Sequence, residues 1–290
     1  MYQALKVVVG YFSKVLAGAL VFSLFTLISC LPEHQLATGY VKTPPAINLL
    51  VSPPETILKY NHKGEAIPGF DSLPEAQKDS MLWVTATYIN QLNDSVLLEI
   101  YMNNFISELR SFGFTVYLND AIDSFMTVKD PQSYVLSMVQ MQVDEYLYPL
   151  EDEEPFQDTI YYKRFDLNAV DFSNWFELSK ASAPTRPRKT ILYSSHSAYD
   201  TFDGNFIMDP WTGSVKYRYK IDSLTMADLN DMAAYLGKKH ASYLYDYFMN
   251  QYIVQHLPKG EELQHYYHFN RFRKSVAPAD IDRFEVLGSK

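Results

Sequence analysis

Cysteine is almost absent from this chain, because Cys30 is the only one among 290 residues. A single thiol cannot close a disulfide within the chain, so the fold must be stabilised by a hydrophobic core. Hydrophobic residues make up 47% of the sequence and aromatic residues 15%, which is enough to build such a core. The composition therefore predicts a globular part without covalent cross-links.

Motifs for common chemistries are absent as well. The chain holds no glycine-rich phosphate loop, no pair of neighbouring cysteines and no Gly-x-Ser-x-Gly nucleophile elbow. The run Ser194-Ser195-His196-Ser197 brings serine and histidine together, but neighbours on a strand point to opposite faces. A nucleophile and its base usually come from separated positions. We therefore expect no catalytic residues and no cofactor, and interpret the chain as a non-enzyme.

A metal site is not expected either. The best candidate ligands are three histidines and two glutamates near the C-terminus: His256, His265, His268, Glu261 and Glu262. Zinc needs three or four converging ligands, and this polar tail offers nothing evident to organise them, which favours exposed histidines. The acidic run Glu151–Glu154 lacks the alternating ligands and central glycine of a calcium-binding loop.

Basic residues are in the minority, with 25 Lys and Arg against 34 Asp and Glu and a formal net charge of −9. An acidic chain is a poor partner for nucleic acid or for anionic lipid headgroups as a general mode of binding. We therefore exclude nucleic acid as a partner.

The N-terminus has the pattern of an export signal. Lys6 and Lys14 give it a positive start, and residues 15–27 are apolar or small apart from Ser23 and Thr26. Such a run suits the hydrophobic region of a signal peptide and is short for a bilayer crossing, which needs about 20 apolar residues. The alternative is an uncleaved membrane anchor with an incidental cysteine.

The run Leu27-Ile28-Ser29-Cys30 resembles the lipobox of bacterial lipoproteins. The resemblance implies that the Cys30 sulfur carries a diacylglycerol with palmitate-type chains and that Cys30 is the mature N-terminus. Several acyl chains anchor a protein stably, at about 0.8 kcal/mol per buried CH₂. Leu31 after the cysteine resembles the default for outer-membrane sorting, so we expect an exported protein of the cell envelope that faces the periplasm.

The rest of the chain predicts an α+β fold. Apolar spacing indicates helices over 94–112 and 225–256, with Gly237 weakening the second helix, whereas 80–91 is ambiguous. Strands are expected at the following ranges: 46–51, 114–118, 134–146, 159–175, 190–206 and 215–221. An acidic loop at 149–155, a basic loop at 183–189 and a turn at 209–213 separate the later strands. Loops between strands predict an antiparallel β-meander, packed by the two main helices as a two-layer sandwich.

The expected domain organisation has four parts. A signal peptide covers 1–29, a lipid anchor and flexible tether 30–45, a single α+β domain 46–258, and an aromatic and charged C-terminal extension 259–290. The extension holds a candidate interaction surface: Tyr266, Tyr267, Phe269, Arg271, Phe272 and Arg273. Alternating aromatic residues there also fit an edge strand kept soluble by its charges.

After the lipobox, the layout of tether, helix, meander and closing helix resembles envelope auxiliary lipoproteins of ABC-type lipid transport or lipopolysaccharide assembly. The resemblance implies a lipoprotein that docks onto a transport or assembly complex without doing chemistry. One alternative is a carbohydrate- or peptidoglycan-binding lipoprotein that uses the tryptophans Trp83, Trp175 and Trp211. A second alternative is an envelope hydrolase that uses the carboxylates Asp200, Asp203 and Asp209. The 23 tyrosines fit half-buried sheet faces or a binding surface.

Overall fold

The computed structural model describes residues 32–128, 130–181 and 189–289. Cys30 and most of the expected basic loop lie outside the described residues. The chain divides into two compact units. The large unit holds Pro45–Tyr245 and Asp282–Lys290, and the small unit holds the residues up to Pro44 together with Asp246–Ile281.

A seven-stranded sheet forms the centre of the large unit, in the order β11-β6-β5-β4-β1-β3, with β2 also paired to β4. The strands are β1 (Asn48–Ser52), β2 (Ile57–Asn61), β3 (Thr115–Tyr117), β4 (Ser133–Phe156), β5 (Thr159–Lys180), β6 (Lys189–Tyr199) and β11 (Glu285–Ser289). The ladder β4-β5-β6 is antiparallel, as predicted, and β11, for which no strand was expected, pairs antiparallel with β6. The expectation of a simple meander is wrong, because β1 and β2 pair with β4 in parallel and β3 pairs with β1 in parallel.

The predicted acidic loop at 149–155 is strand instead, because β4 continues to Phe156 and pairs with β5 throughout. Basic residues of β5 stand opposite the acidic run: Glu151 faces Arg164, and Asp152 faces Lys163. The guanidinium of Arg164 lies 3.6 Å from the Glu151 carboxylate. Opposite charges across neighbouring strands stabilise the pairing modestly, so a run that looks like a loop is compatible with a strand.

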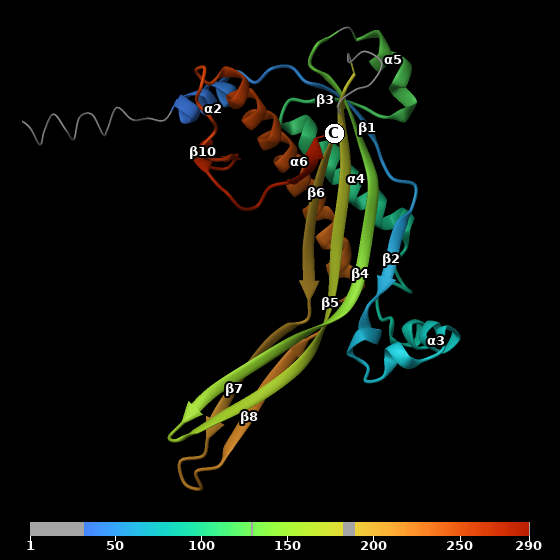
Figure 1. Cartoon of the computed structure of the whole chain (residues 1–290), viewed down its shortest axis with the longest axis vertical. Helices are drawn as coiled ribbons and strands as arrows, with labels where there is room; N and C mark the ends of the chain where they lie inside the picture. Colours follow the sequence, from blue (N-terminus) through green and yellow to red (C-terminus); the bar gives the residue numbers. More distant parts are fainter. Residues whose placement is uncertain (1–31, 129, 182–188, 290) are drawn as a thin grey trace, which may run out of the picture. The chain divides into compact units, whose positions relative to one another are not determined.

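The strand expected at 190–206 divides at Asp200 into β6 and β7 (Thr201–Met208). β7 forms a separate hairpin with β8 (Val215–Asp222) through the predicted turn. This hairpin lies against the outer part of β4 and β5 (Figure 1). The ring centroid of Phe165 on β5 lies 4.8 Å from that of Phe202 and 4.7 Å from that of Tyr219. The Tyr217 hydroxyl of β8 donates a hydrogen bond to the Asp152 carboxylate of β4 at 2.6 Å.

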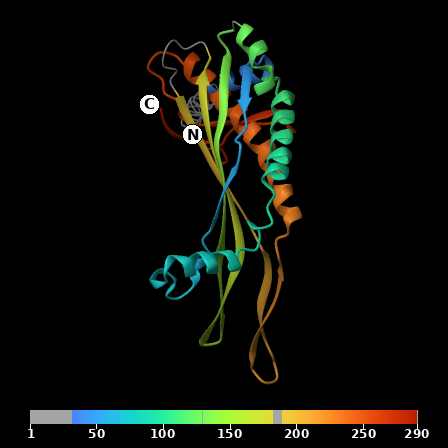
Figure 2. The same cartoon turned by 90° about the vertical axis from the view of Figure 1, so that its right-hand side faces the viewer.

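The two predicted main helices are confirmed as α4 (Asp94–Ser111) and α6 (Met226–His256). Both lie along one face of the sheet (Figure 2). On that face, Phe176 of β5 contacts Phe105 of α4 and His240 of α6, with ring centroids 6.1 and 5.5 Å apart. Gly237 lets the two helices approach closely, because a Cβ there would lie 2.4 Å from the Tyr101 carbonyl oxygen. The glycine therefore serves packing.

Shorter elements complete the large unit. The ambiguous segment 80–91 contains the end of a helix, α3 (Glu75–Thr85), followed by irregular chain. A further helix, α5 (Ile122–Thr127), was not predicted. Three short 3-10 turns are η1 (Lys63–Ala66), η2 (Phe70–Ser72) and η3 (Asn119–Ala121).

The small unit contains α2 (Pro32–Lys42), the end of α6, and a hairpin of β9 (Tyr267–Asn270) and β10 (Ser275–Pro278). The predicted flexible tether is therefore mostly helix, with Ala37 and Tyr40 buried. Proline suits the first position of a helix, whose N–H has no partner within the helix, so Pro32 does not prevent it. The C-terminal extension is not one piece either, since β11 belongs to the large unit.

In the part of the chain that the structure describes, no helix is both long enough and apolar enough to cross a bilayer.

Candidate functional site

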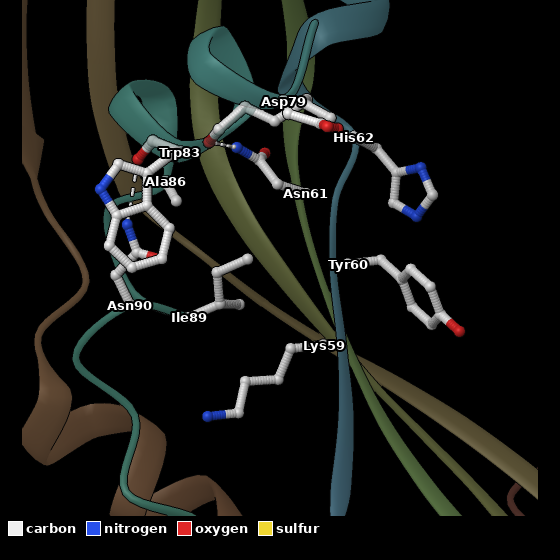
Figure 3. Close-up of a pocket in the computed structure, with 10 residues that line it drawn as sticks. Lys59, Tyr60, Asn61, His62, Asp79, Trp83, Ala86, Ile89 and Asn90 are labelled. Atoms are coloured by element: carbon white, nitrogen blue, oxygen red, sulfur yellow. Dashed lines mark hydrogen bonds between the residues drawn. The ribbon is translucent and has the colours of Figure 1, made fainter. Parts of the chain in front are cut away.

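A pocket of about 580 Å³ opens in the large unit between β2 and the end of α3 (Figure 3). Its lining residues come from β2, from α3 and from the irregular chain after α3: Lys59, Tyr60, Asn61, His62, Asp79, Leu82, Trp83, Ala86, Ile89 and Asn90. The lining combines apolar side chains with amides and charged groups, which is the usual character of a binding pocket.

The β2 wall of the pocket is a sheet edge, since β4 is the only described strand that pairs with β2. The backbone N–H of His62 donates to the Glu145 carbonyl of β4 at 2.7 Å. Because the direction of backbone groups alternates along a strand, the N–H and C=O groups of Lys59 and Asn61 point away from β4. Their side chains point toward α3, and those of Tyr60 and His62 point to the other side (Figure 3).

The opposite wall carries an exposed indole. Trp83 near the end of α3 is 69% exposed. The Nδ2 group of Asn90 donates to the Trp83 carbonyl oxygen at 3.0 Å, and that of Asn61 donates to the Leu82 carbonyl at 2.6 Å (Figure 3). These amides fix the end of α3 beside β2. The backbone that carries the indole is therefore fixed at the pocket by hydrogen bonds that do not involve the ring.

A buried ion pair stands behind the pocket. The Lys63 ammonium lies 2.6 Å from the Glu145 carboxylate, and both side chains are almost completely buried. The backbone N–H groups of Thr87, Tyr88 and Ile89 donate to the same carboxylate at 2.7–3.1 Å. Burial alone would raise the pKa of Glu145, but Lys63 and these N–H groups hold it below its ordinary value. One carboxylate thus fixes the chain that forms the pocket's inner wall.

The network continues into the sheet. The Lys63 ammonium also donates to the Asn168 side chain at 2.7 Å, and Asn168 donates to the Asp200 carboxylate from both its backbone and its side-chain nitrogen at 2.9 Å. Asp200 further accepts from the Leu224 N–H at 2.8 Å. A satisfied polar network of this kind rigidifies its surroundings, so the inner wall is a firm surface.

The pocket offers a ligand hydrogen-bonding, charged and apolar groups. Lys59 is not a free cation, because its ammonium lies 2.6 Å from the Asp94 carboxylate and donates to the Leu92 carbonyl at 2.9 Å. The other lining groups include the Asp79 carboxylate and the His62 ring, together with backbone donors and acceptors of β2 on one side and the Trp83 ring with apolar neighbours on the other. This combination suits a ligand that has its own amide groups and an apolar side chain.

A serine and a histidine do lie within hydrogen-bonding distance in this fold, but the histidine is His240 and not His196 of the run Ser194–Ser197. The Ser194 hydroxyl lies 2.6 Å from Nε2 of His240, and Nδ1 of His240 lies 2.7 Å from the Tyr101 hydroxyl. All three residues are buried, and burial lowers the pKa of His240 well below its ordinary value. Since 46 residues separate Ser194 from His240, no local pattern predicts the pair. Its burial makes it part of the core.

His196 lies beside His240, with ring centroids 5.7 Å apart, and belongs to a cluster that holds the C-terminal segment. Its Nε2 is 3.3 Å from the Tyr243 hydroxyl, which donates to Asp282 at 3.0 Å. The Lys239 ammonium lies 2.8 Å from the same carboxylate. Burial and the charge of Lys239 lower the pKa of His196 to about 4, so the ring is neutral at physiological pH.

The three tryptophans lie on different elements. Trp83 lines the pocket, Trp175 of β5 packs on Tyr193 of β6 with ring centroids 4.8 Å apart, and Trp211 is 93% exposed in the turn between β7 and β8. The Trp211 turn is ordered by Asp209, whose carboxylate accepts from the Trp211 and Thr212 N–H groups at 2.8 and 3.1 Å. The predicted tryptophan surface is therefore not one site.

The three candidate hydrolase carboxylates have separate tasks. Asp200 is buried in the network described above, Asp203 lies on β7 opposite Lys220, and Asp209 orders its turn. At about 3.3 Å per strand residue, Asp203 and Asp209 are roughly 20 Å apart, too far for a glycosidase pair.

The predicted interaction surface in the small unit is divided by the fold. Tyr267 is only 1% exposed, and its N–H donates to the Asn250 side chain at 2.8 Å. Arg271, Phe272 and Arg273 are exposed at the β9–β10 turn. Tyr266 and Phe269 are half-buried. An exposed turn thus replaces the continuous surface expected from sequence.

Two of the three histidines considered as metal ligands have other partners. His268 pairs through Nδ1 with the buried Asp246 carboxylate, and Nδ1 of His256 lies 2.8 Å from the Tyr252 carbonyl oxygen. Over residues 32–128, 130–181 and 189–289, no three His, Cys, Asp or Glu side chains gather in a way that could hold a metal ion.

Comparison with protein-family models and with curated proteins gave no match to this chain.

Proposed function

We propose that this chain is a non-enzymatic, lipid-anchored lipoprotein of the cell envelope that docks onto a transport or assembly complex. The lipobox-like run that ends at Cys30 supports export and anchoring. The pocket beside β2 supports docking, because it offers hydrogen-bonding groups and an exposed indole on a firm wall. We infer that the partner is an envelope protein.

The free edge of β2 carries this proposal. The outward backbone groups of Lys59 and Asn61 can pair with an extended polypeptide, as happens when a peptide adds a strand to a sheet. In such an added strand, alternate side chains face opposite ways, so one set would lie against Trp83 and Ile89. The bound segment should therefore carry a large apolar side chain flanked by backbone free to form hydrogen bonds.

Proline at position 59 tests this mode of binding. Lys59→Pro removes an N–H that points away from β4, so the ladder with β4 stays intact, and proline is tolerated on edge strands for this reason. Lys59→Ala is the matched control, since it also loses the contact with Asp94 but keeps the N–H. A photoreactive residue in place of Asp79, on the pocket lining, reports the partner in intact cells.

We expect the Asp79 probe to form an adduct with an envelope protein in the otherwise natural chain and in Lys59→Ala, and the adduct to be lost in Lys59→Pro. A probe in place of the exposed Asp123 on α5 should give no such adduct. Equal adducts in Lys59→Pro and Lys59→Ala would rule out strand addition. Absence of any adduct at position 79 in the otherwise natural chain would count against docking at this pocket.

Binding of carbohydrate or peptidoglycan is the second candidate, favoured by the sheet face opposite the helices. By strand alternation, the Trp175–Tyr193 pair lies on that face. Polar side chains adjoin it: the Ser173 hydroxyl donates to Ser195 at 3.1 Å, and the Gln142 amide donates to Asp144 at 2.8 Å. Binding at this face predicts that tryptophan fluorescence changes with muropeptides in the original chain and does not change in Trp175→Phe.

A further inference from the structure

The turn between β9 and β10 forms a basic and aromatic tip in the small unit. We define the tip as residues 271–274, Arg-Phe-Arg-Lys, all of which are exposed. The ring of Phe272 is fully exposed. The tip therefore presents one aromatic ring among three basic side chains.

The base of this hairpin is firmly built. Asn250 on α6 accepts from the Tyr267 N–H and donates to the Tyr267 carbonyl oxygen, each at 2.8 Å. The buried Asp246 carboxylate accepts from the Phe269 N–H at 2.9 Å. At the tip itself, the Asn270 side chain accepts from the Arg273 N–H at 2.9 Å. The tip is therefore presented on an ordered support.

The same unit carries the chain that follows the expected lipid attachment. Pro32, the first residue of α2, comes two residues after Cys30. Near the start of α2, the Glu33 carboxylate accepts from the Gln264 N–H at 2.6 Å, and the His34 ring lies 6.2 Å from that of Tyr267. Phe272 follows Tyr267 by five residues and lies in the turn after β9, so the two are at most about 17 Å apart. A bilayer holding the acyl chains is therefore within reach of the tip.

Charge separates this unit from the acidic remainder of the protein. Its described residues include five acidic side chains and five basic ones, three of which belong to the tip. Two of the acids, Glu33 and Asp246, are buried. The exposed surface of the small unit is therefore net positive, although the chain as a whole carries −9.

We propose that the tip contacts the anionic headgroups of the membrane in which the protein is anchored, with Phe272 inserted at the interface. Aromatic rings favour the boundary between headgroups and acyl chains, and each basic residue near an anionic surface strengthens binding about fivefold. The contact orients the small unit on the bilayer. It rests on the proposed lipid anchor but does not depend on docking at the β2 pocket.

The single cysteine provides the test. If the Cys30 sulfur is acylated, Phe272→Cys adds the only reactive thiol, which an environment-sensitive fluorophore can label. The labelled full-length lipoprotein is reconstituted into vesicles of phosphatidylcholine alone or with phosphatidylglycerol. Flotation with the vesicles reports the anchor. Quenching of the fluorophore by lipids that carry nitroxides in their acyl chains reports contact of the tip, and Trp211→Cys is the matched label in the other unit.

We expect a blue shift and quenching at position 272 on vesicles with phosphatidylglycerol, and a water-like signal at position 211. Changing Arg273 and Lys274 together to glutamine should reduce the quenching, as should high salt. A floating protein whose label at 272 remains water-like would overturn the membrane contact while leaving the anchor in place. A response to soluble muropeptides but not to lipid would also overturn it. Failure to float would refute the anchor and this proposal together, and would leave the Asp79 cross-link as a separate test of docking.

Discussion

The ammonium of Lys63 and the carboxylate of Glu145 form an ion pair of 2.6 Å inside the large unit, with side-chain exposures of 6% and 0%. The pair does more than neutralise two charges. Through three backbone N–H groups it fixes the chain at Thr87–Ile89, and through Asn168 it reaches Asp200. The inner wall of the candidate site therefore depends on residues that do not themselves line the pocket.

Glu145→Gln should destabilise the protein strongly. The amide preserves the shape of the side chain but leaves the Lys63 ammonium buried without its counter-charge, which costs about 3–5 kcal/mol. Urea unfolding followed by circular dichroism measures the loss. The matched control is Glu65→Gln, which removes an exposed carboxylate 3.0 Å from His62 and should change stability by less than about 0.5 kcal/mol. Similar midpoints for the two variants would contradict this account of the pair.

Stability should also fall as the pH is lowered from about 6.5 toward 4. Histidines of the unfolded chain take up protons near pH 6.5, whereas burial and Lys239 lower the pKa of His196 to about 4, and burial lowers the pKa of His240 well below its ordinary value. Below pH 6.5 the unfolded state therefore binds more protons. The free energy of unfolding should decrease by up to about 1.4 kcal/mol per pH unit for each histidine.

Urea midpoints between pH 7.5 and 4.5 measure this slope. In His196→Gln the slope should be smaller, because one of the two buried histidines no longer contributes to it. Equal slopes in the original chain and in His196→Gln would show that folding does not lower the pKa of His196.

Ser194 should not react as a nucleophile, even though its hydroxyl lies 2.6 Å from His240. The serine is 6% exposed and the histidine 0%, so a substrate has no route to them. Intact-mass spectrometry after treatment with a fluorophosphonate should find no covalent adduct in the folded protein. An adduct that disappears in Ser194→Ala would contradict this prediction and would revive the enzyme alternative.

The helices could be predicted from sequence because their signals are local. Apolar residues at three-to-four spacing indicate α4 and α6, and Thr225 with Asp228 marks the start of the second helix through reciprocal hydrogen bonds at 2.6–3.3 Å. Strand pairing involves distant residues. No local pattern indicates that β2 pairs in parallel with β4, 84 residues later, and that pairing creates the free edge in the pocket.

One part of the candidate site, the buried carboxylate of Glu145, could nevertheless be predicted from the sequence. Glu145 shares its strand face with the buried Met141 and Val143, so the alternation of β4 predicts a carboxylate that points into the core and needs a partner. The partner could not be identified, since Lys63 lies in a loop-like stretch, residues 62–71, that has no apolar period. Trp83 was singled out by residue type alone. Its neighbours in the pocket depend on where α3 meets β2, which the sequence does not specify.

Gly237→Ala should destabilise the large unit, although alanine is the better helix former. A Cβ at this position would lie 2.4 Å from the Tyr101 carbonyl oxygen and 3.0 Å from the Phe105 nitrogen. Both atoms are backbone, so α4 and α6 must separate, and overpacking of this kind costs about 1–3 kcal/mol. Gly39→Ala in α2 is the matched control, because nothing lies within 4 Å of its Cβ position. That change should stabilise its helix by roughly 0.5–1 kcal/mol. Opposite shifts of the two urea midpoints would support the close crossing of the helices, whereas two stabilising shifts would mean that α4 and α6 are farther apart than described.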